Sequence, residues 1–441
     1  MILLLLTYTA MLYLCMILFN RNMACPSFLL TAGFWASSVV ALINQDAWKG
    51  FNAPGFYSVT IGGVACFIAG AYLNSLFYSK QKATQLELQP VTIAKWKYGF
   101  CLALEIVILI LSMYVVFQNA TSRNPLTAAG EYYVANKYGH LTYDPSYFSI
   151  IQYLNIGSMY IYLYILLNNI VCKWKNEIGL YALFGVGVII SLMQGTRNTL
   201  FMVVISGIVM FLILSSIRDG WIPNIRFSSL WKVLLGVFAV VALFQISLIL
   251  TGRSSTEFTF SELVYTYLGA PLKNLELYLN ENHEKASIFG GQTFLQTYKK
   301  LYSMTNNPAF NVTSVYKYRW VGKHSLGNVY TMLMPLYNDF GLFGMYLIMA
   351  LIGFITEWQY EAIRHMKKYA YIKNSVILYA YVSFTIAFAF FSNKYFETVV
   401  SMAFIYVLIG LAVIHVVLFN ISVDENGIVI KLHQKHQNQD R

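Results

Sequence analysis

The segment that decides the fold opens with Thr251-Gly252-Arg253 and closes with His324-Ser325-Leu326. Between these ends it is polar, with eight Lys or Arg residues and five Glu residues. On both sides the chain consists of apolar runs of about 20 residues, the length at which a helix crosses a ~30 Å hydrocarbon core. The sequence therefore predicts a membrane scaffold that carries one large polar loop.

The composition of the whole chain points to the same class of protein. Of its 441 residues, 58% are hydrophobic and 11% are charged, whereas soluble domains contain about 25% charged residues. The ~10-residue segments of alternating hydrophobicity that are typical of a transmembrane β-barrel do not occur in the sequence. We therefore expect an all-α polytopic integral membrane protein.

The formal charge of +11 does not indicate a nucleic-acid partner. Most Lys and Arg residues lie in short segments beside apolar runs, where they set topology and contact lipid headgroups. The five cysteines lie in or at the ends of apolar runs, and no Cys-x-x-Cys occurs. Neither a disulfide framework nor a zinc site is expected.

Eleven apolar runs are predicted to be spans. The first has no basic residues before it and is followed by Asn20-Arg21, which favours a span over a removed signal peptide. The predicted spans are 2–19, 26–44, 55–78, 98–118, 147–171, 178–194, 199–217, 231–250, 328–357, 375–392 and 396–419.

These spans divide the chain into four parts. Spans 1 to 8 fall in residues 1–250, with an external loop at about 119–146. The large loop follows at 251–326, spans 9 to 11 fall in 327–419, and a polar tail occupies 420–441. No internal repeat and no separate soluble domain is evident.

The distribution of basic residues sets the predicted orientation. With the N-terminus outside, the inside segments hold 17 Lys or Arg residues and the short outside segments hold five. The positive-inside rule then places the large loop outside and the C-terminus in the cytoplasm. Apolar residues in the loop recur at helical spacing from Phe260 to Leu279. They predict helices that either lie along the membrane surface or pack together as a small cap.

Two arginines stand at predicted outer membrane edges. Arg197 follows Gly195-Thr196 between two apolar runs, and Arg253 comes directly after the eighth span. A guanidinium is costly to bury in hydrocarbon, and its planar fork fits phosphate oxygens. The pair is therefore suited to clamp the diphosphate of an isoprenoid lipid. The alternative for Arg197 is a turn residue whose side chain snorkels to the interface.

A third group of polar residues ends the loop and enters the next run. It contains Arg319 and His324, and histidine suits general-base work because its ordinary pKa is near neutrality. The alternative for His324 is a solvated loop residue. Asp339 falls inside a predicted span, where an acid is a functional hypothesis by default. It is equally suited to pair with an arginine or to end a helix.

Other ionisable groups and missing motifs bound the function further. Glu105, Glu357 and His415 lie in or at the ends of predicted spans, where a proton-coupled transporter places such groups. The sequence has no phosphate-cradling Gly loop with Lys-Ser/Thr, no Asp-x-Asp and no metal-ligand cluster. This argues against a cytoplasmic sugar-nucleotide transferase and against ATP-driven transport.

Three motifs stand at the edges of the predicted spans and of the loop. They are Gly195-Thr196-Arg197, Thr251-Gly252-Arg253, and Gly327-Asn328-Val329-Tyr330 leading to Asp339-Phe340-Gly341-x-x-Gly344. With these motifs, with about eleven spans and with the single dominant outer loop, most of the chain resembles the Wzy-type O-antigen or oligosaccharide repeat-unit polymerases of bacterial envelopes. The architecture is also similar to O-antigen ligases and to GT-C-like integral-membrane glycosyltransferases that use lipid-linked donors.

The resemblance implies an enzyme of the bacterial inner membrane that needs no metal or other cofactor. A growing glycan would pass from undecaprenyl diphosphate to a hydroxyl of an incoming lipid-linked repeat unit, and undecaprenyl diphosphate would leave. Membrane lipids and a chain-length regulator are the implied partners. Arg197, Arg253 and Arg319 would bind the diphosphate, His324, Asp339 or Glu131 would take the proton, and Asn328 and Tyr330 would orient the substrate.

Two competing functions stay open at this point. An O-antigen ligase would use the same donor with a lipid A core acceptor. A lipid-linked oligosaccharide flippase would form no glycosidic bond. A flippase needs no large outer loop and usually shows internal repeats, and neither expectation matches the sequence.

Overall fold

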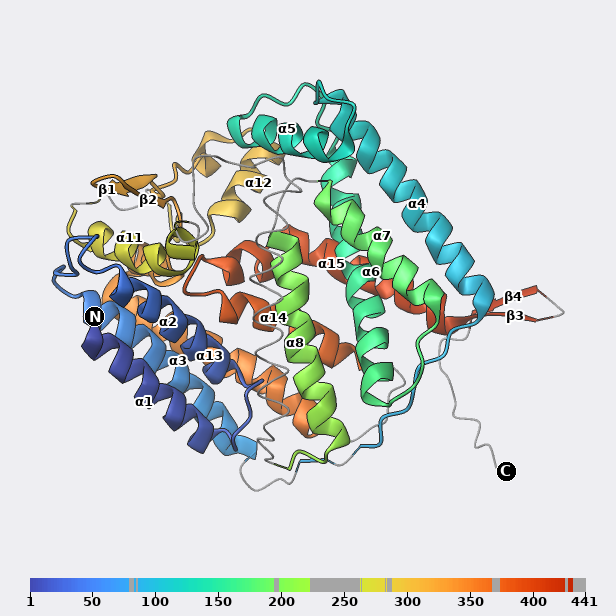
Figure 1. The fold of residues 1–441 in the computed structure, drawn as a ribbon, viewed down its shortest axis with the longest axis horizontal. Coiled ribbons are helices and arrows are strands. Elements are labelled where there is room, and N and C mark those ends of the chain that lie inside the picture. The colour runs from blue at the N-terminus through green and yellow to red at the C-terminus, as the bar shows by residue number, and fades with distance from the viewer. Residues whose placement is uncertain are drawn as a thin grey trace. The chain divides into compact units, whose positions relative to one another are not determined.

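The computed structural model describes residues 1–78, 83–84, 86–193, 198–222, 262, 264–281, 283, 288–366, 373–424 and 427–430. Most of these residues are helical, and seven helices are long and apolar enough to cross a membrane. This confirms a helical membrane protein with several spans (Figure 1). The seven are α2 (Pro26–Ile43), α3 (Phe56–Tyr78), α4 (Lys95–Gln118), α6 (Ser146–Val171), α8 (Asn198–Arg218), α13 (Leu333–Arg364) and Met402–Asn420, the last formed by α15 (Met402–His415) and a π-helix (Val416–Asn420).

Three more predicted spans coincide with shorter apolar helices. These are α1 (Ile2–Leu18), α7 (Ile178–Leu192) and α14 (Asn374–Ala387). The predicted span 231–250 lies outside the described residues. The total of eleven spans and the orientation therefore stay predictions.

The chain forms two compact units. Unit 1 takes its described residues from 1–87, 208–238 and 255–402, and unit 2 takes its own from 88–207, 239–254 and 403–441. The described residues of the large loop from Glu262 onward belong to unit 1.

In unit 1, α3 and α13 pack with their backbones in close approach. A Cβ placed at Gly70 would lie 1.9 Å from the carbonyl oxygen of Ala350, and one at Gly353 would lie 2.1 Å from that of Phe67. Helices in lipid gain little from the hydrophobic effect, so small residues that admit close van der Waals contact stabilise their association. These glycines therefore fix the α3–α13 pair.

A sharp turn at Gly341 divides α13. Its φ of 67° and ψ of −172° are non-helical values within the run, in a region that essentially only glycine occupies. The helix after Gly341 is alone long enough, at ~1.5 Å per residue, to cross the ~30 Å core. The structure therefore corrects the prediction of an unbroken span 328–357 with Asp339 inside it. Asp339 ends the short helix that precedes the turn.

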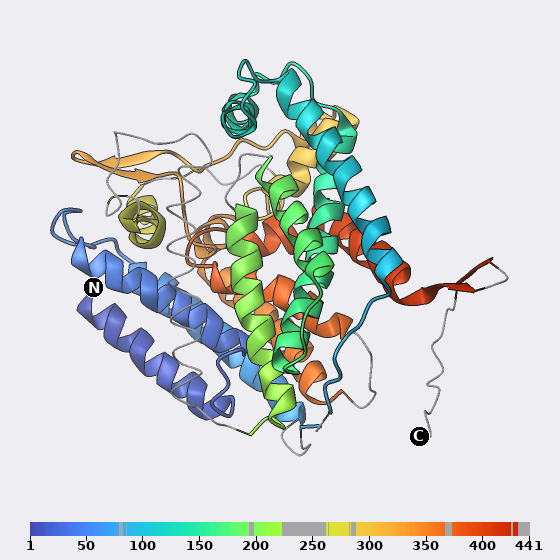
Figure 2. The ribbon, with the colours of Figure 1, turned by 45° about the vertical axis from the view of Figure 1, so that its right-hand side comes forward.

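The large loop folds into short elements on unit 1. One of these elements, α11, is buried on its polar side as well as its apolar side. Lys273 and Glu276 are 3% and 2% exposed, and Leu272 and Leu275 are fully buried. This helix, α11, lies between the β1–β2 hairpin and the end of α2 (Figures 1 and 2). The elements are a π-helix (Tyr265–Gly269), α11 (Ala270–Leu279), α12 (Leu295–Thr305), a 3₁₀ turn (Pro308–Phe310), β1 (Arg319–Val321) and β2 (His324–Gly327).

A buried ion pair explains why α11 does not lie on a membrane surface as an amphipathic helix. Lys273 Nζ lies 2.6 Å from Glu276 Oε2 and donates to the carbonyl oxygen of Gly50 at 2.7 Å. Glu276 Oε1 accepts the backbone N–H groups of Asn52 and Ala53 at 3.0 and 3.1 Å. The polar side of α11 is thus satisfied by the α2–α3 connection and not by water or headgroups.

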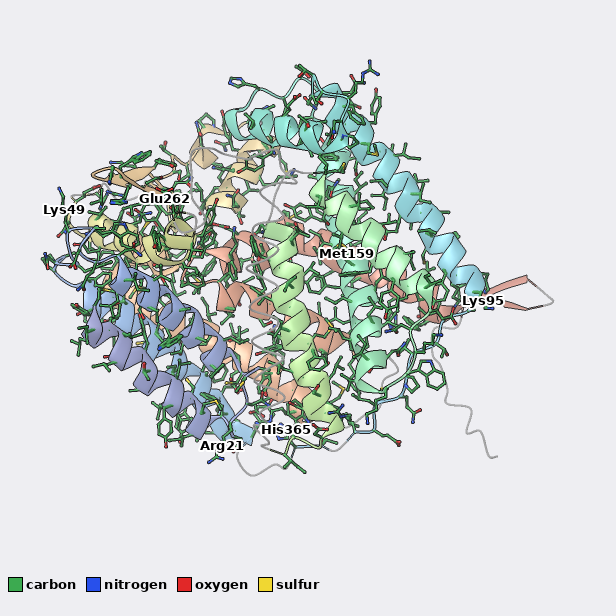
Figure 3. All side chains as sticks on the ribbon, viewed as in Figure 1. Arg21, Lys49, Lys95, Met159, Glu262 and His365 are labelled. Carbon is green, nitrogen blue, oxygen red and sulfur yellow. The ribbon has the colours of Figure 1, made fainter. Side chains whose placement is uncertain are left out.

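The helices of unit 1 end at two places, a loop end and a far end. At the loop end, the N-terminal amine donates to the Tyr57 hydroxyl at 3.3 Å, beside the α2–α3 connection that α11 contacts. At the far end, the rings of Tyr78 and His365 stack with their centroids 5.1 Å apart. Figure 3 shows Lys49 at the loop end, and Arg21 and His365 at the far end. Which of these ends faces the outside of the membrane stays a prediction.

In unit 2, α5 (Pro125–Tyr138) closes over the ends of α4 and α6. The side chain of Asn124 caps α5 by accepting the N–H of Leu126 at 3.0 Å. Tyr132 and Phe148 form an edge-on ring pair, with centroids 5.5 Å apart, in a small buried cluster with Val115. About half of the predicted external loop 119–146 is thus helical. The start of the polar tail forms a hairpin of β3 (Ile421–Asp424) and β4 (Gly427–Ile430).

Candidate functional site

A cavity of about 330 Å³ opens at the loop end of unit 1. Its volume lies in the range of about 300–1,000 Å³ that small-molecule sites occupy. Its walls come from the start of α12, from two stretches of the loop, and from the segment after α14. The lining residues are Gln292, Thr293, Leu295, Gln296, Lys299, Ser314, Tyr316, Asn328, Val329, Tyr330, Phe391, Ser392, Asn393, Lys394 and Glu397.

Amide side chains shape the wall of this cavity. Asn393 is 2% exposed; its Nδ2 donates to the carbonyl oxygen of Thr293 at 2.9 Å, and its Oδ1 has no partner within the described part of the chain. Gln292 Nε2 donates to the carbonyl oxygen of Thr313 at 2.8 Å, and its Oε1 accepts the N–H of Val315 at 3.1 Å. A buried acceptor without a donor is costly. Asn393 lines the cavity, so this acceptor belongs to a polar part of its wall.

The charges in the cavity are one ion pair and one further cation. Lys394 Nζ lies 2.6 Å from Glu397 Oε2, and Glu397 Oε1 accepts the hydroxyl of Ser392 at 3.0 Å. Lys299, on α12, is an exposed lining residue. The lining therefore carries a net positive charge, which favours a ligand with an anionic group.

Asp339 supports this cavity from behind. Its Oδ2 accepts the backbone N–H groups of Gln292 at 3.0 Å and Thr293 at 2.7 Å, and its Oδ1 accepts Asn338 Nδ2 at 3.0 Å. Both backbone donors belong to buried residues that line the cavity. The carboxylate is therefore occupied in holding the wall, and we interpret Asp339 as a positioning residue.

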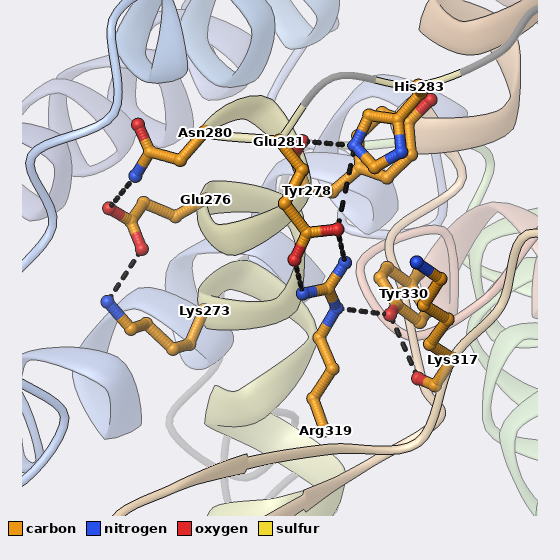
Figure 4. Close-up of polar contacts among 9 residues, drawn as sticks. All are labelled: Lys273, Glu276, Tyr278, Asn280, Glu281, His283, Lys317, Arg319 and Tyr330. Carbon is orange, nitrogen blue, oxygen red and sulfur yellow. Dashed lines mark hydrogen bonds and ion pairs between the residues drawn. The ribbon is translucent and has the colours of Figure 1, made fainter.

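Arg319 is engaged in a network of its own (Figure 4). Its guanidinium forms a two-pronged ion pair with Glu281, with Nη2 2.9 Å from Oε2, and its Nε donates to the Tyr330 hydroxyl at 2.6 Å. The hydrogen bonds from Arg319 hold the pKa of Glu281 below its ordinary value. The Arg319 side chain is 10% exposed. Its charge is thus balanced by Glu281, which weakens it as a diphosphate ligand.

Tyr330 joins the Arg319 network to the cavity. Its hydroxyl also donates to the carbonyl oxygen of Lys317 at 2.9 Å, and burial raises its pKa. The side chain is 1% exposed and its ring lies edge-on to Tyr316, with centroids 5.5 Å apart. Tyr330 and Asn328 both line the cavity. Of the two, Asn328 is exposed and offers its amide to a ligand.

The other predicted proton acceptors lie apart from this lining. His324 begins β2 and pairs with Val321 across the hairpin, half-buried and outside the set of lining residues. Glu131 is on α5 in unit 2, where it accepts the backbone N–H groups of Thr121 and Ser122 at 2.6 and 3.2 Å. These hydrogen bonds lower the pKa of Glu131. Its carboxylate braces the start of the 119–146 segment.

The two arginines predicted to bind diphosphate, Arg197 and Arg253, lie outside the described residues. Their predicted role therefore stays a prediction. The structure brings Asn328 and Tyr330 together at the cavity and places Asp339 behind it.

Sequence reasoning missed the cavity residues Lys299, Asn393 and Glu397. The sequence indicates Lys394 only as one of the five basic residues in the short outside segments. The signal in the sequence was Asn393-Lys394 followed three residues later by Glu397, a spacing at which Lys and Glu pair on one helical turn. Polar residues at the junction of the last two predicted spans were therefore a sign of a site at that edge.

Comparisons give no closer assignment. No protein-family model, no curated protein and no solved structure matches the chain. Within the described residues no group of three or more His, Cys, Asp or Glu side chains is placed to hold a metal ion.

Proposed function

We propose that the chain is a glycosyltransferase that polymerises lipid-diphosphate-linked oligosaccharide repeat units at the outer face of the cytoplasmic membrane. The cavity at the loop end is the observation that carries this proposal. Its amides and hydroxyls suit a sugar, because a sugar hydroxyl both donates and accepts hydrogen bonds. The excess cation, Lys299, suits the anionic diphosphate of the donor.

The reaction needs three contributions from the protein. A hydroxyl of the incoming unit attacks the anomeric carbon of the growing glycan, a C–O bond forms, and the bond from that carbon to the diphosphate oxygen breaks. The hydroxyl proton passes to a base, and Glu397 is the carboxylate that lines the cavity. Negative charge develops on the departing diphosphate, where a fixed cation is most effective.

Under this proposal the cavity residues divide the work. Glu397 accepts the proton, and Lys394 beside it keeps the carboxylate in place. Asn328 and Asn393 orient sugar hydroxyls. Lys299 binds the diphosphate. The role of Arg197 and Arg253 stays a separate prediction from the sequence.

The test is a polymerisation assay with purified protein and synthetic lipid-diphosphate-linked repeat units, read as a ladder of products. We expect Glu397→Gln to slow ladder formation by roughly 10²–10⁴-fold, the usual contribution of a general base. Lys299→Ala should raise the donor KM, and Lys300→Ala is the matched control, because Lys300 is also exposed on α12 but does not line the cavity.

Three outcomes would contradict the proposal. One is a wild-type protein that moves the lipid-linked unit across a bilayer but forms no glycosidic bond, as a flippase does. Another is transfer to lipid A core alone, as a ligase does. The third is an unchanged ladder in folded Glu397→Gln and Lys299→Ala proteins, which would remove the cavity from the mechanism.

A further inference from the structure

A second cavity, of about 270 Å³, lies at the far end of unit 1. It is walled by the C-terminal ends of α1, α3 and α13, which contribute Leu18, Tyr78 and His365 among others. The proposed glycosyl transfer uses none of these residues, and the cavity is at the end of the unit opposite the candidate site.

Opposite charges meet in this second cavity. Arg364 Nη1 and Glu361 Oε1 form an ion pair, and His365 Nδ1 lies 3.2 Å from Glu361 Oε2 and donates to the Glu361 carbonyl oxygen at 3.0 Å. The Glu361 side chain is 3% exposed. The guanidinium lies over the ring of Trp221, 5.7 Å from its centroid, and its buried Nε has no hydrogen-bond partner among the described residues. The Arg364 side chain is 15% exposed and lines the cavity, so a ligand there would meet its positive charge.

A simple anion does not fit this arrangement well. It would meet the carboxylate of Glu361 beside the guanidinium, and the C-terminal ends of three helices carry partial negative charge. A ligand with both a phosphate and a primary ammonium group matches both signs. The phosphate would bind the Arg364 guanidinium through a charge-assisted hydrogen bond. The ammonium would bind Glu361.

The walls of the cavity indicate where such a ligand comes from. Tyr72 and Leu76 line it and are 38% and 47% exposed, and the neighbouring Leu73 and Phe77 are 58% and 73% exposed. These side chains lie near the C-terminal end of α3, a helix long and apolar enough to span a membrane. A bilayer would cover this exposed apolar surface. A headgroup in the cavity would leave its acyl chains against that surface.

We propose that the second cavity binds the headgroup of a zwitterionic phospholipid, with its phosphate on Arg364 and its primary ammonium on Glu361. The bound lipid ties the ends of α1, α3 and α13 together. The site is independent of the polymerase proposal, since it concerns lipid binding alone.

The test uses the full chain in nanodiscs made with equal amounts of phosphatidylethanolamine, phosphatidylcholine and phosphatidylglycerol. Lipids that remain after transfer to detergent are quantified by mass spectrometry. We expect wild-type protein to retain phosphatidylethanolamine over both others. Arg364→Gln should lower its retention by about tenfold or more, as expected from the loss of a charge-assisted hydrogen bond.

The Glu361→Gln variant gives the sharper result. It leaves Arg364 unpaired, so retention should shift from phosphatidylethanolamine to the anionic phosphatidylglycerol. Arg21→Gln is the matched control, because Arg21 is an exposed cation at the far end (Figure 3) that does not line the cavity. It should retain lipid as the wild type does.

Several outcomes would overturn the proposal. Equal retention of the three lipids by the wild type would do so without any variant, even if a substituted chain fails to fold. A folded Glu361→Gln protein with unchanged preference would remove the ammonium site. Displacement of the retained lipid by inorganic phosphate, with no preference among headgroups, would show a general phosphate site.

Discussion

Replacement of Asp339 separates a residue that holds the cavity wall from one that takes a proton. In Asp339→Asn the amide oxygen can replace Oδ2 and keep the N–H groups of Gln292 and Thr293, now at 3.0 and 2.7 Å. The amide nitrogen then faces Asn338 Nδ2, and that hydrogen bond is lost. Hydrogen bonds to a charged acceptor contribute ~1.5–3 kcal/mol and neutral ones ~1 kcal/mol. We expect Asp339→Asn to lower the free energy of unfolding by about 1–3 kcal/mol.

Asp339→Ala removes both oxygens and leaves the two backbone donors buried. Each unsatisfied group costs ~1–3 kcal/mol, so the loss should be about 2–6 kcal/mol. The assay is thermal unfolding in detergent, combined with the rate of ladder formation at saturating donor.

The rate of the Asp339→Asn protein decides the role. If Asp339 is a positioning residue, Asp339→Asn should lose less than about tenfold in kcat, because the cavity wall stays in place. Loss of a general base would cost roughly 10²–10⁴-fold. A hundredfold loss of kcat in a protein that melts at the wild-type temperature would refute our interpretation of the carboxylate.

Three further predictions follow from the same description. The pKa of Glu281 is lowered in the folded chain, so the stability that its carboxylate contributes is fully present above its unfolded pKa of ~4.3 and is lost as pH falls through the lower folded value. The difference in melting temperature between the wild type and Glu281→Gln should therefore disappear in that acidic range. A difference that stays constant with pH would contradict this prediction. Gly341→Ala should lower the free energy of unfolding by about 1–3 kcal/mol through backbone strain alone, since no atom lies within 4 Å of the added Cβ. Gly185 is a helical glycine with equally open surroundings, so Gly185→Ala should raise the free energy of unfolding by up to ~1 kcal/mol. Thermal melts of both proteins check this. Gly70→Ala should cost about 1–3 kcal/mol, because the new Cβ would meet the Ala350 carbonyl; unfolding measured beside the Gly185→Ala protein checks this, and equal melting temperatures would count against close α3–α13 packing.

The helices could be predicted from the sequence because an apolar run is a local pattern. Each of the ten predicted runs that fall within the described residues contains an apolar helix. A helix that crosses the hydrocarbon core needs about 20 consecutive apolar residues, and such a run can be recognised in one stretch of sequence. The turn at Gly341 could not be predicted from the sequence, because Gly344 is also a glycine, three residues later, and stays helical.

The cavity was harder to predict from the sequence because its walls come from segments that are far apart in the chain. Residues near 292, 315, 329 and 394 meet there, and no local pattern relates them. The role of Asp339 illustrates the limit. Its donors are backbone N–H groups 46 and 47 positions earlier in the chain, and a backbone N–H leaves no mark in an amino-acid sequence.

The contact between α11 and the α2–α3 connection also determines the order of steps in co-translational folding. Glu276 accepts the N–H of Asn52 from 224 positions away. At ~5–20 residues per second, a ribosome needs roughly 11–45 seconds to make the intervening chain. During that interval the turn between the second and third helices has no carboxylate to bind. Membrane insertion of the early helices therefore precedes the closing of this end of the unit, and a nascent chain that stops before Ala270 would leave that turn open.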